Sequence, residues 1–345
     1  MQEPLAAPHV GVLMRISGLL FLLIAVSQSA LAQPNIDALV QTLRSNPQDA
    51  LRENAAHTLG QIALILGPVQ AAPALPALLD AVRTDRAPAV RREASIAITS
   101  IGTSPPVIPF YIVAMRTVSD INAFDTARAV VTSYVNTASP QDIANLKILD
   151  NLRAYRDSLY SLPRSNGKAT RLDDIFLLFA STCQRSPSDQ AGLIADFRQT
   201  LDRFAPIPSN QRDMPWMRPI NGLSSCGSDG AQALLDATQQ FALNDKIDTL
   251  VSLQTTWPSY PSAFIQQEQS RLLSYAMDVL NTFPDSWNCK YAVSIPTFKQ
   301  LGPFAAPAAA KLRMVAALSQ QASSARYGFP VCGQAEAQDA LQSIQ

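Results

Sequence analysis

The stretch NPQDALRENAAHTLGQI at residues 46–62 decides the fold, because it recurs further along the chain as DRAPAVRREASIAITSI at residues 85–101. Each copy opens with a proline-containing turn and continues with apolar residues at helical spacing. The preceding segments, residues 38–46 and 77–85, align at the same offset and also carry an apolar stripe at helical spacing. The sequence therefore predicts two successive pairs of amphipathic helices.

A looser third copy follows at a shorter offset. It aligns Arg83 with Arg116 and Ala94 with Ala127. Self-similarity at such a period is the signature of a helical repeat protein. We expect the repeats to extend to about residue 135.

The first copy carries the pattern Asn46-Pro47-x-x-x-Leu51-Arg52-x-x-Ala55-Ala56-x-x-Leu59-Gly60-x-Ile62. This pattern resembles a HEAT repeat of the type found in phycobilisome-lyase-like proteins, and residues 85–94 resemble the next repeat. The resemblance implies an all-α fold, a right-handed α-solenoid of helix pairs over residues 33–135. It also implies that Arg52 and Arg91 fix the turn within each repeat and so have a structural role.

The remaining region, residues 136–345, stays helical in pattern but is irregular. We expect it to continue the array as diverged helical repeats separated by Pro- and Ser-containing loops, for example at residues 205–219. The expected helices cover residues 141–161, 170–184, 188–204, 229–243, 245–256, 261–283, 303–324 and 334–344.

The four cysteines show a regular spacing. The number of residues from Cys183 to Cys226 equals the number from Cys289 to Cys332. This equal spacing indicates a diverged duplication of the region. Four cysteines allow three connectivities, and we favour the disulfides Cys183–Cys226 and Cys289–Cys332. The alternative is a zinc site, which lacks support from CxxC spacing or histidine.

Residues 1–32 resemble a secretory signal peptide. Arg15 is followed by the apolar run Ile16–Val26 and by Ala30-Leu31-Ala32, a small-x-small cleavage site. Met14 would make a cleaner start than Met1, and the alternative is a buried amino-terminal helix. We expect a periplasmic or secreted protein whose mature chain starts near Gln33. We expect no transmembrane segment in it, since every later apolar run is shorter than a membrane-spanning helix requires.

Charge and histidine content restrict the chemistry. The chain has 27 Lys+Arg against 27 Asp+Glu, which argues against nucleic acid as a partner. Cleavage would leave His57 as the single histidine, and its alignment with Ile96 predicts a packing position. The sequence contains no GxSxG, P-loop or HExxH motif, so we expect no catalytic residues, no metal site and no cofactor.

Three carboxylates are candidates for acid–base chemistry. Asp173 and Asp174 are adjacent, but neighbouring helical positions point about 100° apart, and acids near a helix start are favoured by the helix dipole. Asp285 near Trp287 resembles an acid–aromatic pair for sugar binding. For all three carboxylates we favour a structural role.

The tryptophans Trp216, Trp257 and Trp287 all lie in loops of the irregular region. Nearby are Met214, Met217, Tyr260, Phe264 and Tyr291. Exposed aromatic residues would form a ligand-binding surface, and the alternative is that they plug the ends of helix pairs.

The sequence as a whole favours an exported, non-catalytic HEAT-repeat scaffold that binds another protein or an envelope component. The alternative is a cell-envelope enzyme on a helical solenoid, either a polysaccharide hydrolase or a lyase-like protein. A third possibility is a structural subunit of an envelope complex. Fold alone does not decide among them.

Overall fold

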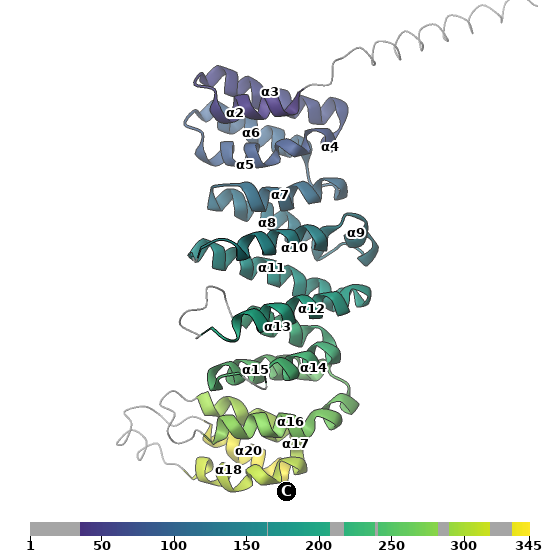
Figure 1. Ribbon diagram of the computed structural model, residues 1–345, viewed down its shortest axis with the longest axis vertical. Helices are drawn as coiled ribbons and strands as arrows, with labels where there is room; N and C mark the ends of the chain where they lie inside the picture. Colours follow the sequence, from purple (N-terminus) through teal and green to yellow (C-terminus); the bar gives the residue numbers. More distant parts are fainter. Residues whose placement is uncertain (1–34, 164, 208–216, 239–240, 282–289, 318–332) are drawn as a thin grey trace, which may run out of the picture. The chain divides into compact units, whose positions relative to one another are not determined.

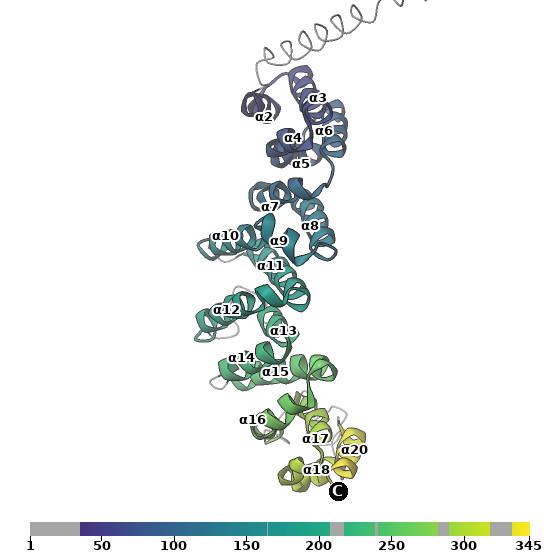
Figure 2. The same ribbon diagram turned by 90° about the vertical axis from the view of Figure 1, so that its right-hand side faces the viewer.

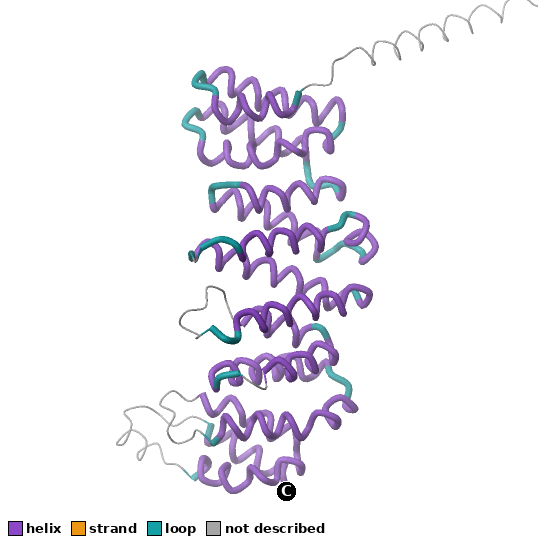
Figure 3. The backbone as a smooth tube through the Cα atoms, in the orientation of Figure 1, coloured by secondary structure: helices purple, strands orange, loops and turns teal. Residues whose placement is uncertain are grey.

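The structure is a computed structural model that describes residues 35–163, 165–207, 217–238, 241–281, 290–317 and 333–345. All regular secondary structure in these residues is helical, and none of them forms a strand (Figure 3). The predicted all-α class is therefore confirmed. The chain divides into two compact units, Met1–Val130 (unit 1) and Val131–Gln345 (unit 2), which are described separately. The expected signal peptide, residues 1–32, lies outside the described residues.

Unit 1 consists of helix pairs. Its helices are α2 (Ile36–Ser45), α3 (Asp49–Leu66), α4 (Pro68–Ala71), η1 (Ala72–Ala74), α5 (Leu75–Thr84), α6 (Pro88–Ile101), η2 (Pro105–Val107), α7 (Ile108–Thr117) and α8 (Ile121–Val135), whose last turn belongs to unit 2. The first helices α2, α5 and α7 form one layer, and the second helices α3, α6 and α8 form the other (Figure 2). The turns that join the two helices of each pair lie on one side of the unit, at the left of Figure 1.

The helix ends of unit 1 follow from local sequence. The side chain of Asn35 caps α2 by accepting a hydrogen bond from the Ala38 N–H at 3.0 Å. Pro88 begins α6, where its missing N–H costs nothing. Gly67 follows α3 and Gly102 follows α6, with positive φ angles of 103° and 65°. Only glycine adopts such angles readily, so these two residues end the helices.

Small side chains let α3 and α6 approach closely. Ala55, Ala56, Ala94 and Ala97 are all buried between the helix layers. A Cβ atom at Gly60 would lie 3.2 Å from the Cα atom of Ala97, so glycine permits this approach. The contact between α3 and α6 joins the first two helix pairs.

Unit 2 contains longer and less regular helices. They are α9 (Pro140–Asn145), α10 (Ile148–Tyr160), α11 (Asn166–Arg185), α12 (Pro187–Phe204), α13 (Met217–Ser225), α14 (Gly227–Thr238), α15 (Leu243–Thr256), η4 (Trp257–Ser259), α16 (Ser262–Leu280), η5 (Lys290–Ser294), α17 (Ile295–Leu301), η6 (Gly302–Ala308), α18 (Ala309–Ala316) and α20 (Gln334–Ile344). Each of α11, α12 and α13 contacts both the next helix and the helix after it. Phe176 and Phe179 on α11 meet Phe197 on α12 with ring centroids 5.9–6.2 Å apart, which gives unit 2 an aromatic core.

The helix prediction differs from the structure in several places in unit 2, and it lacks α17 altogether. The expected helix 141–161 is broken before α10, where Lys147 takes a left-handed φ of 51°. The expected loop 205–219 ends early because α13 begins at Met217, and Pro219 fits within its first turn. Residues 303–308, expected to start an α-helix, belong to the 3-10 helix η6 instead.

Within the parts of the chain that the structure describes, no helix combines the length and the apolar character that crossing a membrane requires.

Candidate functional site

The turn between α2 and α3 is held by Arg52, whose side chain is only 7% exposed. Its Nη1 donates to the carbonyl oxygen of Asn46 at 2.8 Å. Its Nε and Nη2 donate to the two carboxylate oxygens of Asp85, at 2.7 and 2.9 Å. Because Asp85 follows α5, this bidentate pair connects the first helix pair to the second.

Arg91 occupies the equivalent place in the second pair. Its Nη1 donates to the carbonyl oxygen of Asp85, six residues earlier, at 2.8 Å, just as Arg52 bonds Asn46 six residues earlier. Asn46 and Asp85 also correspond, since each side chain accepts a hydrogen bond from the N–H two residues later at 2.9 Å. Both arginines therefore fix a turn, the structural role expected for them.

Two further contacts join successive helix pairs of unit 1. Arg86 pairs with the carboxylate of Asp49 at 3.1 Å and donates to the carbonyl oxygen of Pro47 at 2.8 Å. Asp80 on α5 accepts from the Ser119 N–H, in the turn after α7, at 3.0 Å. The polar contacts thus recur at each step from one pair to the next.

Ion pairing lowers the pKa values of the acidic groups in these turns. Hydrogen bonds from Arg52 lower the pKa of the Asp85 carboxyl, against the opposing effect of burial. Hydrogen bonds from Arg52 and Arg86 lower the pKa of Asp49 in the same way. The Asp85 hydrogen bond in turn raises the pKa of Arg52, so the whole group stays ionised.

A hollow of about 550 Å³ opens beside these turns. Its walls come from the end of α2, from α5, and from the turns that follow α2, α5 and α7. They include Arg44, Asp80, Thr84, Arg86 and Ser119. The hollow is polar and open, and it is wide enough to hold part of an extended ligand.

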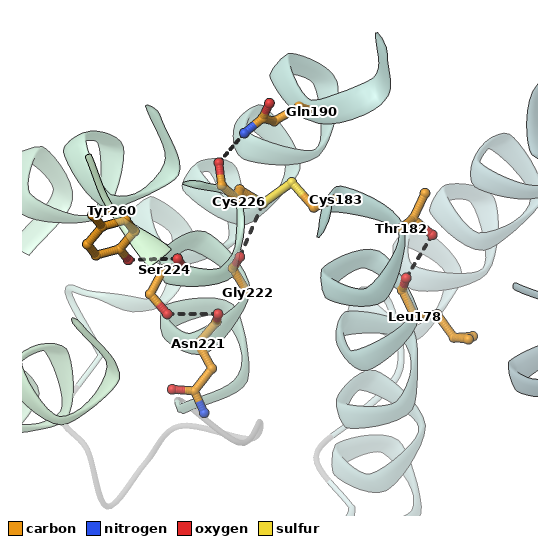
Figure 4. The surroundings of a disulfide bond; sticks show 9 residues. All are labelled: Leu178, Thr182, Cys183, Gln190, Asn221, Gly222, Ser224, Cys226 and Tyr260. Carbon is orange, nitrogen blue, oxygen red and sulfur yellow. Dashed lines mark hydrogen bonds between the residues drawn. A yellow bond between two sulfur atoms is a disulfide. The ribbon is translucent and has the colours of Figure 1, made fainter. Parts of the chain in front are cut away.

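Unit 2 contains a disulfide between Cys183, near the end of α11, and Cys226, between α13 and α14 (Figure 4). This is the pairing favoured by the equal spacing of the cysteines. The side-chain amide of Gln190 on α12 donates to the carbonyl oxygen of Cys226. The Tyr260 hydroxyl donates to the Ser224 carbonyl oxygen at 2.7 Å, so α11, α12 and the η4–α16 turn all meet the α13–α14 junction.

The tightest charged group in unit 2 is a buried pair. Arg156 on α10, with a side chain 4% exposed, donates from Nη1 to Asp196 on α12 at 2.7 Å. Arg153 donates to the other oxygen of the same carboxylate at 2.8 Å. The guanidinium of Arg156 also lies 5.9 Å from the ring centroids of both Tyr160 and Phe179. This group is structural, because it ties α10 to α12.

No family model, curated protein or solved structure matches this chain. The candidate surfaces below therefore rest on the chain's own geometry.

Among the tryptophans expected to bind ligand, only Trp257 lies in the described residues. This residue is half-buried and begins η4, the short 3-10 helix between α15 and α16. Its neighbours Tyr260 and Phe264 are buried and stack with ring centroids 5.2 Å apart, and burial raises the pKa of Tyr260 to about 12. Trp216, Trp287, Asp285, Cys289 and Cys332 lie outside the described residues.

The packing position predicted for His57 is wrong. The imidazole is 54% exposed, and its Nδ1 lies 3.2 Å from Glu93 on α6. Ile96, the residue aligned with it, is itself 49% exposed, so the alignment identified an equivalent position on the outer face. Asp173 pairs with Arg218 on α13 at 2.7 Å, which gives this carboxylate a structural partner.

The described residues contain no group of three or more His, Cys, Asp or Glu side chains placed to share a metal ion. Sequence reasoning missed one surface, where the end of α3 meets α4. There Leu64, Ile65, Leu66 and Val69 are between 41% and 74% exposed. Their hydrophobic run is visible in the sequence, but their exposure depends on how α3 is rotated.

Proposed function

We propose that this chain is an exported, non-catalytic scaffold, an α-solenoid of HEAT-like repeats that binds a partner protein. Repeats that contact their neighbours in series build extended surfaces, which suit elongated protein ligands better than small molecules. Export rests on the signal-like segment at residues 16–32 and is supported by the Cys183–Cys226 disulfide, since disulfides persist in oxidising compartments.

The observation that carries this proposal is a contact made twice. Arg52 and Arg91 each bind the carbonyl oxygen six residues earlier, and Arg52 also reaches the carboxylate of the following turn. The same arginine–carbonyl contact thus stabilises the turn in two successive helix pairs, as expected for a repeated unit. The open hollow beside these turns offers such a surface to a ligand.

Affinity capture of the full chain from the envelope fraction, after crosslinking in cells, tests this function. The captured protein is then purified, and hydrogen exchange of the chain is compared with and without it. We expect protection that recurs at equivalent positions of successive helix pairs, at the intervals of the sequence repeat. Protection confined to one locus, together with turnover of envelope polysaccharide, would instead support the alternative of an envelope enzyme.

Export has its own measurement. Mass spectrometry of the amino-terminal peptide from the envelope fraction should give a mature chain that starts near Gln33. Recovery of the intact leader from the cytoplasm alone would contradict export.

A further inference from the structure

Three arginines occupy the same place at the ends of the first helices of unit 1. Arg44, Arg83 and Arg116 are each the penultimate residue of α2, α5 and α7. A Ser or Thr follows each of them, and its hydroxyl donates to the carbonyl oxygen four residues earlier. Each helix then ends at a residue with extended backbone. We call these three residues the arginine ladder.

The side chains of the ladder are exposed. Within the residues that the structure describes, none of the three guanidinium groups forms an ion pair or a hydrogen bond. The other exposed arginines of unit 1 differ, because Arg86 pairs with Asp49 and Arg92 pairs with Glu93. Among the exposed arginines in the described part of unit 1, those without an acidic partner therefore share one repeated position.

Helix-dipole stabilisation does not account for this pattern. A cation in the last turn favours any helix, since the carbonyl end carries partial negative charge. The second helices α3, α6 and α8 of the same unit nevertheless have no basic residue in their last turn. The arginines follow the layer of first helices, where the turns share one side of the unit (Figure 1).

The spacing of the ladder is set by helix packing. α2 contacts α5, and α5 contacts α7, so the axes of adjacent first helices lie about 8–10 Å apart, and we expect the same spacing for the arginines at their ends. The three positions then span about 16–20 Å, twice that distance. Of the three ladder residues, Arg44 lines the hollow of about 550 Å³, where Arg86, Asp80 and Asp85 also lie.

We propose that the arginine ladder binds an extended acidic segment of the partner protein, with a carboxylate at every third residue. A polyproline II segment rises about 3.1 Å per residue and returns to the same face every three residues, so its carboxylates recur about every 9 Å. This interval matches the interhelical distance, and guanidinium groups bind carboxylates in a bidentate manner. The inference rests on the proposed scaffold function and names the chemistry of its partner.

Two synthetic peptides of identical composition test the periodicity. One has Glu at every third of nine positions and Pro elsewhere, and its isomer has the three Glu residues contiguous at the centre. Binding to the full chain is measured by fluorescence anisotropy at low and high salt. We expect the periodic peptide to bind about tenfold more tightly at low salt, because each exposed ion pair is weak and three must add.

Variants of the chain identify the arginines. The triple variant Arg44→Gln, Arg83→Gln and Arg116→Gln should remove the difference between the peptides, while the matched control Arg92→Gln should retain it. The triple Lys variant at the same positions keeps the charge and should retain part of the preference, which excludes misfolding as the cause. Equal binding of the two peptides, or unchanged binding by the triple Gln variant, would overturn the proposal. Tighter binding of a uronic-acid oligomer of equal charge would overturn it in favour of a polysaccharide.

Capture of the envelope partner distinguishes failure of the arginine-ladder proposal from failure of the scaffold function. If the triple Gln variant captures the envelope partner as well as the wild-type chain does, the scaffold function stands and the ladder is not its contact. If neither chain captures a partner, the scaffold function itself fails.

Discussion

In unit 1, α3 and α6 meet through alanine and glycine, whereas in unit 2, α11 and α12 meet around three phenylalanine rings. The small side chains of unit 1 bring backbones close together and leave each turn near the next. Arginine then links the turns, as Arg52 does with Asp85. In unit 2 a buried ion pair and a disulfide stabilise the helices in addition to the aromatic core.

The difference shows that the two units are stabilised by different kinds of contact. Identical contacts need identical spacing, so a unit that keeps them also keeps its period. Unit 2 is stabilised instead by individual contacts such as Arg156–Asp196 and Cys183–Cys226. The arginine–carbonyl contacts of unit 1 should therefore respond alike at equivalent sites. The Arg52–Asp85 pair and the contacts of unit 2 should respond individually.

The largest expected effect is in unit 2. Asp196→Ala leaves the buried guanidinium of Arg156 without its main partner, and we expect a loss of about 3–5 kcal/mol in the free energy of unfolding. Urea denaturation measures this loss. Asp157→Ala is the control, because this second partner of Arg156 is 61% exposed and should contribute less than about 1 kcal/mol. Equal losses from both variants would mean that burial does not distinguish the two contacts.

Removal of the disulfide comes next. Cys183→Ala with Cys226→Ala opens a loop closed across a sequence separation of 43, and we expect a loss of about 2–4 kcal/mol in unfolding free energy. Hydrogen exchange should rise in α11, α13 and α14 and stay unchanged in α3 and α6. If exchange rises equally in α3 and α6, the contrast between the two units is wrong.

Equivalent arginines in unit 1 sharpen the comparison at a smaller scale. Arg52→Ala removes hydrogen bonds to a carboxylate, to a second acid and to a turn carbonyl, so we expect a loss of about 2–3 kcal/mol. Arg91→Ala removes only carbonyl contacts and should cost about 1 kcal/mol. Thermal and urea denaturation of both variants provide the measurement, and a larger loss from Arg91→Ala would contradict the role assigned to Asp85.

The smallest effect concerns acid. Arg52 lowers the folded-state pKa of Asp85, so the unfolded chain binds this proton more readily. The stability from this pair is complete above the unfolded pKa of about 3.9 and is lost as pH falls through the lower folded pKa. Between about pH 5 and pH 2.5, the unfolding free energy of wild type should therefore fall more steeply than that of Asp85→Asn. Matching slopes would show that Asp85 contributes nothing to acid sensitivity.

The parts predictable from sequence are those fixed by local spacing. Arg52 and Arg91 keep one distance from a turn residue, so their shared role follows from the repeat. The Cys183–Cys226 pair follows from spacing in the same way. The break at Lys147 does not, because a left-handed backbone is usually marked by glycine or asparagine.

Only part of the candidate site could be predicted from the sequence. Alignment of Arg83 with Arg116 showed a repeated arginine, but an unpaired charge can be recognised only when all neighbouring acids are placed. The exposure of His57 likewise depends on the rotation of α3 about its axis. The alignment shows that His57 corresponds to Ile96, but it does not show whether either position faces the solvent.

Asp85 belongs to two helix pairs at once. Its carboxylate receives Arg52 from the pair before it and the Ala87 N–H from its own turn, while its carbonyl oxygen receives Arg91. A deletion or insertion that moved the α5–α6 turn away from α3 would therefore leave the buried guanidinium of Arg52 without its carboxylate. The first two helix pairs of unit 1 are coupled through the side chain and the carbonyl group of one aspartate.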